Sequence, residues 1–168
     1  MLLTALTAAG VFAGAYAFSA YGGQSAAELA AHHGGGFIKC FADSLLLTAV
    51  YVGICFFGGF SSAGKPMAYL LCIFKGMGAG FLSACIFSGG ISAADPKTAA
   101  DILPFEAMSL AVIIFAAREN IRLSDLTSKR TFGSAAEGQV DLKLYLTKFA
   151  VIMITAAGAA AIDGLLSM

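Results

Sequence analysis

Residues 66–88 read PMAYLLCIFKGMGAGFLSACIFS and carry one charged side chain, that of Lys75. About 20 consecutive apolar residues are enough for a helix to cross the hydrocarbon core of a membrane. A lysine inside such a helix costs roughly 2.5–3.5 kcal/mol on insertion scales, so it needs a partner, a route to water or a function. Gly76 and Gly80 beside it would let another helix approach closely. The segment therefore predicts a membrane helix with a packing face and one costly charge.

The composition of the whole chain indicates the same class of protein. Of its 168 residues, 59% are hydrophobic and 12% are charged, and the mean hydropathy is +0.85. A soluble domain has about 45–50% apolar and about 25% charged residues. The formal net charge is zero, which argues against nucleic acid as a partner. No change in composition divides the chain, so we expect a single transmembrane domain over residues 1–168.

Five segments are long and apolar enough to span a lipid bilayer. Each is expected to be helical, because backbone polar groups in lipid need hydrogen-bond partners within their own segment. The first could instead be a signal peptide, but no lysine or arginine precedes it as a signal peptide requires. The predicted fold class is therefore all-α, a polytopic membrane protein built as a bundle of five transmembrane helices. The spans are expected at about 2–21, 37–60, 66–88, 102–120 and 144–167.

Basic residues collect in the second and fourth connections between these helices. Connection 22–36 has no lysine or arginine, 61–65 has Lys65, and 118–143 is the most basic. The positive-inside rule places basic connections in the cytoplasm. We therefore expect the N-terminus inside, the C-terminus outside, and 22–36 and 89–101 as outer loops.

The basic end of the fourth helix is expected to lie at the inner membrane surface. Arg118 and Arg122 are four residues apart and share one helical face. With Lys129 and Arg130 they would form a cytoplasmic anchor on lipid headgroup phosphates. Docking of a cytoplasmic partner protein is the alternative for this region.

Depth decides whether Lys75 can pair with Glu106 of the fourth helix. At 1.5 Å per residue, Lys75 lies about 13 Å from the inner end of its span and Glu106 about 7 Å from the outer end of its own. In a core about 30 Å thick this leaves roughly 10 Å between their levels. Side chains also lean toward the N-terminus of their helix, so these two diverge. We therefore expect Lys75 to snorkel toward the cytoplasm instead of pairing with Glu106.

The other acids within the spans have simple explanations and one alternative. Asp43 is expected to pair with Lys39 one helical turn earlier, and Asp163 is close enough to the outer end to reach water. Glu106 follows Pro104, which is tolerated at a helix start. Alternatively, Asp43, Glu106 and Asp163 all lie in the outer half and line a small polar cavity open to the outside.

Small residues suggest which helices pack together. Gly76 and Gly80 form a GxxxG pair in the third span, and residues 156–160 give the last span a similar small face. We expect these two spans to pack on each other. The four cysteines are expected to act as small apolar packing residues; a disulfide between Cys40 and Cys85 is conceivable but has no support.

No arrangement of residues in the spans predicts catalysis. No Ser-His, Cys-His or metal-ligand set occurs there, and the only histidines, His32 and His33, are adjacent in a loop. We therefore expect no catalytic residue, no metal site and no cofactor. The lipid bilayer is the expected partner, and the oligomeric state, a homo-oligomer included, is left open.

Taken in order, several motifs resemble the stage II sporulation protein M family of polytopic membrane proteins. Phe41-Ala42-Asp43-Ser44-Leu45 is similar to the family's second-helix start, and Phe74-Lys75-Gly76 through Gly80-Phe81 to its third-helix run. Ile102-Leu103-Pro104 is similar to the Leu-Pro motif that opens the family's next helix, and Ser124 stands where that helix reaches a serine. Asp163 stands where the family has an acidic residue near the end of its last helix. The resemblance covers about residues 37–168. Phe105-Glu106 departs from the family, which often has His, Gln or Asn there and then a second proline.

The resemblance implies a role outside catalysis. The founding member is a scaffold for septal peptidoglycan remodelling that recruits a lytic transglycosylase and an amidase. We accordingly expect an integral membrane scaffold of a bacterial cytoplasmic membrane that recruits cell-wall-remodelling proteins, peptidoglycan hydrolases among them, during sporulation. The alternative is a small membrane transporter or channel subunit that uses Lys75 and the outer acids.

Overall fold

The structure is a computed structural model that describes residues 1–21, 37–88, 96–131 and 142–166, and its regular secondary structure is entirely α-helical. Four helices are long and apolar enough to cross a membrane, namely α1, α3, α4 and α6. The chain is therefore an all-helical protein suited to a membrane, as the sequence predicts. The helices are α1 (Leu2–Tyr21), α3 (Phe37–Gly58), α4 (Gly64–Phe87), α5 (Pro96–Thr131) and α6 (Leu142–Leu166).

The boundaries of α5 differ most from the expected span. This helix begins at Pro96 and ends at Thr131, so it extends beyond the expected 102–120 at both ends. Proline suits the first helical position, because its missing N–H has no intrahelical partner there. Pro104 therefore lies inside α5 and not at its start, and the prediction that it opens the helix is wrong. At 36 residues, α5 is about 54 Å long and exceeds the thickness of a hydrocarbon core.

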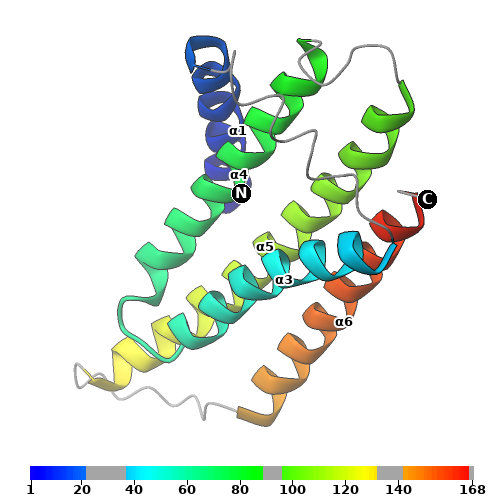
Figure 1. The fold of residues 1–168 in the computed structure, drawn as a ribbon. Helices are drawn as coiled ribbons and strands as arrows, with labels where there is room; N and C mark the ends of the chain where they lie inside the picture. The colour runs from blue at the N-terminus through cyan, green and yellow to red at the C-terminus, as the bar shows by residue number, and fades with distance from the viewer. Residues whose placement is uncertain (22–36, 89–95, 132–141, 167–168) are drawn as a thin grey trace.

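Helix α1 packs along α4, and the two run parallel. Thr7 lies against Gly76 and Val11 against Gly80, so residue numbers rise together along the contact. Figure 1 shows α1 beside α4, at the opposite edge of the molecule from α6. Because α3 lies between them in the chain and returns in the other direction, both α1 and α4 begin at the same end of the bundle.

Four glycines bring the backbones of α1 and α4 into contact. A Cβ atom built on Gly76 would lie 2.5 Å from the Thr7 carbonyl oxygen, and one on Gly10 would lie 2.5 Å from that of Ile73. Cβ atoms on Gly14 and Gly80 would come even closer to backbone oxygens of the facing helix. The contact therefore depends on two matched GxxxG pairs, one on each helix.

The prediction that Gly76 and Gly80 pack against the last span is wrong. Their partner is α1, because the spacing of Gly10 and Gly14 repeats that of Gly76 and Gly80 and lets both backbones approach. The small face of α6 is buried elsewhere: Ala159 and Ala160 pack with Phe105 of α5 and lie beside two residues of α3.

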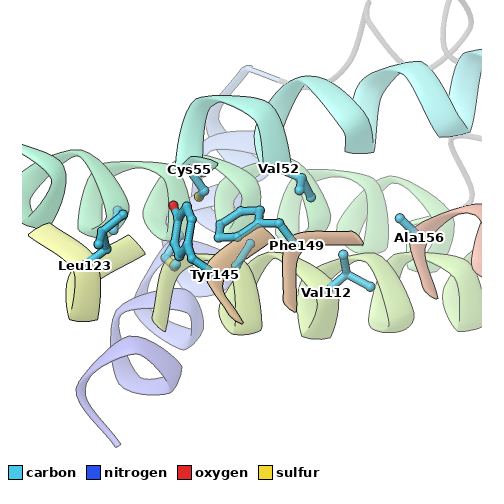
Figure 2. Packing of buried hydrophobic residues seen from close by; sticks show 11 residues of the cluster. Val52, Cys55, Val112, Leu123, Tyr145, Phe149 and Ala156 are labelled. Carbon is cyan, nitrogen blue, oxygen red and sulfur yellow. The ribbon is translucent and has the colours of Figure 1, made fainter. Parts of the chain in front are cut away.

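The main core lies where α3, α4, α5 and α6 meet. Figure 2 shows the rings of Tyr145 and Phe149 side by side, with Cys55 of α3 on one side and Val112 of α5 on the other. The Tyr145 ring also stacks on Phe56, with centroids 5.4 Å apart, and its hydroxyl donates to the Phe56 carbonyl oxygen at 2.9 Å. The buried cluster consists of Val52, Cys55, Ala68, Cys72, Val112, Ala116, Ala117, Leu123, Tyr145, Phe149 and Ala156.

Substituting Gly80 by valine should separate α1 from α4. Gly78 is the matched control, because it lies on the same helix and a Cβ atom there meets nothing within 4 Å. We expect Gly80→Val to lower the free energy of unfolding by about 1–3 kcal/mol more than Gly78→Val, as overpacked sites do. Thermal unfolding in mild detergent measures the difference in stability between the two variants. Unfolding is monitored by the reaction of the buried cysteine thiols with a fluorogenic maleimide. Equal unfolding midpoints for the two variants would contradict the glycine contact.

Candidate functional site

Lys75 and Glu106 form a buried ion pair between α4 and α5. The Lys75 Nζ lies 2.8 Å from Oε2 and 3.1 Å from Oε1 of Glu106, so both carboxylate oxygens accept from it. Lys75 is 4% exposed as a residue, and the Glu106 side chain is 16% exposed. The prediction that Lys75 snorkels toward the cytoplasm is therefore wrong.

The two residues lie at a similar depth because α4 and α5 both begin earlier than predicted. Because α4 begins at Gly64, Lys75 lies about 16 Å from the start of its helix; because α5 begins at Pro96, Glu106 lies about 15 Å from the opposite end. Both residues therefore lie at the level of the middle of α4. The flexible four-carbon stem of lysine closes the remaining separation.

Ser109 completes the polar group around Glu106. Its hydroxyl donates to the Glu106 carbonyl oxygen at 3.0 Å and lies 3.4 Å from Oε2. The opposite charges of Lys75 and Glu106 attract each other, which offsets part of the desolvation penalty that either would incur alone in an apolar setting. We define the intramembrane pair as Lys75 and Glu106, with Ser109 as the third member of its hydrogen-bond group.

The other two acids are engaged separately from the intramembrane pair. Asp163 accepts a hydrogen bond from the Ser44 hydroxyl at 2.6 Å, which joins the C-terminal part of α6 to the N-terminal part of α3. Asp43 and Lys39 are both exposed, and within the described ranges no ion pair joins them, so that expected pair does not form. Asp163 thus links two helices, where the sequence suggested a residue that reaches water.

A second polar group holds the turn between α3 and α4. The Ser124 hydroxyl of α5 donates to the Ser61 carbonyl oxygen at 2.9 Å. Asn120, one turn earlier, is fully buried between two glycines: a Cβ atom on Gly58 would lie 2.8 Å from its Nδ2, and one on Gly64 would lie 2.6 Å from its Oδ1. Neither amide atom has a hydrogen-bond partner among the described residues.

Sequence reasoning missed Asn120 and the role of this turn. The available signal was a polar side chain one turn before Ser124, together with the glycines at 58, 59 and 64. Small residues at a helix-helix contact allow a bulky polar group from a third helix to fit. The resemblance drew attention to Ser124, and the structure gives that serine a role in holding the turn.

Two ion pairs partly neutralise the charges in the second half of α5. Lys148 of α6 pairs with Glu119 of α5 at 2.8 Å, and Lys65 of α4 pairs with Asp125 of α5. Arg118 and Arg122 are exposed, and neither is in any of the ion pairs that the structure describes. The side chains of Lys129 and Arg130 lie outside the described residues. Of the four residues expected to form the cytoplasmic anchor, the structure therefore describes the side chains of Arg118 and Arg122.

The cysteines occupy the packing positions expected of them. Cys55, Cys72 and Cys85 are buried free thiols. Within the part of the chain that the structure describes, no group of three or more histidine, cysteine or acidic side chains could hold a metal ion. His32, His33 and the Cys40 side chain lie outside that part.

No protein-family model, curated protein or solved structure matches this chain. The resemblance to the stage II sporulation protein M family therefore stays a prediction. The geometry of the described residues supplies the remaining support for any function.

Removing one member of the intramembrane pair should destabilise the protein more than removing both. Lys75→Met leaves the Glu106 carboxylate without its partner, and breaking a buried pair in this way costs about 3–5 kcal/mol. The double variant Lys75→Met/Glu106→Met removes both charges and should unfold close to the wild-type midpoint, because well-packed apolar replacements are often neutral. Thermal unfolding in detergent with thiol labelling provides the comparison.

Lys39→Met is the control for loss of a lysine, since Lys39 is exposed on α3. We expect its midpoint to match the wild type. A double variant as unstable as Lys75→Met alone would show that the two residues do not interact.

Proposed function

We propose that this chain is a multi-pass membrane scaffold that recruits cell-wall-remodelling proteins, peptidoglycan hydrolases among them, during sporulation. This is the role implied by its resemblance to the stage II sporulation protein M family. The chain would contribute helix surfaces and loops as binding sites, with no chemical step of its own.

The observation that carries the proposal is how the interior polar groups are used. Lys75 and Glu106 neutralise each other, Ser44 bonds to Asp163, and Ser124 bonds to the turn at Ser61. The first two contacts each join two helices, and the third joins α5 to the turn between α3 and α4, so together they fix the relative positions of the helices. A scaffold needs such rigidity, whereas a transport pathway needs polar groups that can exchange partners with a moving solute.

A five-span arrangement with the N-terminus in the cytoplasm accompanies this proposal. The parallel course of α1 and α4 suits it, since both helices would then leave the cytoplasmic side. The intramembrane pair makes α5 acceptable as the fifth span, because its most deeply placed acid is neutralised.

In this arrangement the C-terminus would lie outside. A phosphatase that is active only outside the cytoplasm should therefore be active when it is fused to the C-terminus. An inactive fusion would contradict this orientation.

The second candidate is a small transporter or channel subunit. The feature that favours it is the same ion pair, because paired charges at mid-membrane depth often mark ion or proton pathways. The Glu106 side chain is 16% exposed, so a small part of the carboxylate side chain can be reached from outside the protein interior.

Photo-crosslinking in the native membrane separates the two candidates. The tagged wild-type chain and the double variant Lys75→Met/Glu106→Met are crosslinked in cells, purified and compared by quantitative mass spectrometry, with an unrelated multi-pass protein as background. A scaffold should enrich cell-wall hydrolases about equally with and without the intramembrane pair, since the pair would have only a structural role.

Flux measurements on the protein reconstituted in liposomes test the transporter alternative. Solute or proton flux with the wild type that disappears in the folded double variant, together with no enrichment of cell-wall proteins, would overturn the scaffold in favour of the transporter.

A further inference from the structure

A groove of about 410 Å³ lies between α5 and α6 and is partly open at the surface of the bundle. Val112, Phe115 and Arg118 line its α5 side, and Lys148, Val151 and Thr155 line its α6 side. We call this the α5–α6 groove. Its volume falls within the range of about 300–1,000 Å³ that is usual for sites that bind small molecules.

The groove changes from apolar to basic along its length. The two helices are antiparallel and their levels are set by the contact of Lys148 with Glu119. Val112 and Thr155 therefore lie toward the middle of the helices, and Arg118 and Lys148 lie at the inner end. This order matches a phospholipid, whose acyl chains occupy the hydrocarbon core and whose phosphate lies at its boundary.

Charge at the inner end favours an anionic occupant. Lys148 is paired with Glu119, but an ammonium group has three donors and retains capacity for a second acceptor. Arg118 is exposed and belongs to none of the ion pairs formed by described residues, so its planar guanidinium is available for a phosphate. Two cations thus face one carboxylate, which leaves the inner end of the groove positive.

The wall of the groove favours a lipid chain over a protein helix. Phe115 is 59% exposed and Val151 is 57% exposed, so both present apolar surface to whatever lies there. A helix with its side chains is about 10–12 Å across, which is wide for a groove of this volume, whereas an acyl chain is narrow and apolar throughout.

We propose that the α5–α6 groove binds one anionic phospholipid, with its phosphate at Arg118 and Lys148 and an acyl chain along Val112, Phe115 and Val151. The bound lipid would fill the gap between the two helices and fix their inner ends at the membrane surface. This goes beyond general attraction of basic residues to headgroups, because it assigns one lipid to one site.

Native mass spectrometry of the delipidated full chain in neutral detergent tests this assignment. Phosphatidylglycerol is the anionic probe and phosphatidylcholine the neutral one, each titrated into wild type and variants. We expect the wild type to bind one phosphatidylglycerol in preference to phosphatidylcholine. Arg118→Gln should weaken phosphatidylglycerol binding by about tenfold or more, the usual effect of losing a charge-assisted hydrogen bond.

Two further variants make the result specific to the groove. Lys143→Gln removes an exposed cation of α6 that does not line the groove, and it should change affinity by less than about twofold. Thr155→Phe fills the apolar part and should reduce binding of both lipids, while its unfolding midpoint shows that the chain is folded.

Equal affinity of wild type and Arg118→Gln for phosphatidylglycerol would overturn the proposal. So would equal losses in Arg118→Gln and Lys143→Gln, which would indicate only diffuse attraction to basic residues. A dimer that excludes lipid and that Thr155→Phe dissociates would assign the groove to a second copy of the chain instead.

Discussion

The ion pair between Lys75 and Glu106 is the constraint on which the arrangement of the helices depends. Neither charge can be left alone in an apolar interior, so wherever α4 is placed, α5 must bring its carboxylate to the same depth. This requirement fixes the rotation of both helices about their axes as well as their relative height. It also turns a different side of α4, the one with Gly76 and Gly80, toward α1.

The bundle can be understood as two parts joined through α4 and α5. One part is the parallel pair of α1 and α4, held by backbone contact at four glycines. The other is formed by α3, α5 and α6 around Tyr145 and Phe149, and Ala68 and Cys72 of α4 also pack into it. Besides the intramembrane pair, the join includes the turn after α3, where Asn120 and Ser124 of α5 meet residues 58–64. The contacts of α4 therefore differ in chemistry: they are polar at the turn before the helix, ionic at Lys75 and steric where Gly76 and Gly80 face α1.

The apolar runs predicted most helices because the length of a membrane span is a physical requirement that the sequence must meet. The start of α5 was harder to predict, because Lys97 and Asp101 look like loop residues, although polar side chains are compatible with a helix outside the hydrocarbon core. Placing that start too late moved Glu106 toward the outer end and removed it from the reach of Lys75. The glycines of α4 predicted a packing face but not its partner, since small residues occur on several helices. Gly10 and Gly14 carried the matching spacing, and only the fold distinguishes that match from the small face of α6.

Solid-state NMR in lipid bilayers provides the most direct measurement of the intramembrane pair. Lysine labelled with ¹⁵N at Nζ and glutamate labelled with ¹³C at Cδ would report dipolar coupling between Lys75 and Glu106, with the Lys148–Glu119 pair as an internal reference. Nζ distances of 2.8 and 3.1 Å to the two carboxylate oxygens predict strong coupling. Part of that coupling should disappear in Glu106→Gln while the reference remains. Coupling that is unchanged by Glu106→Gln would contradict the ion pair, because Lys75 would then lie away from the carboxylate that positions α5.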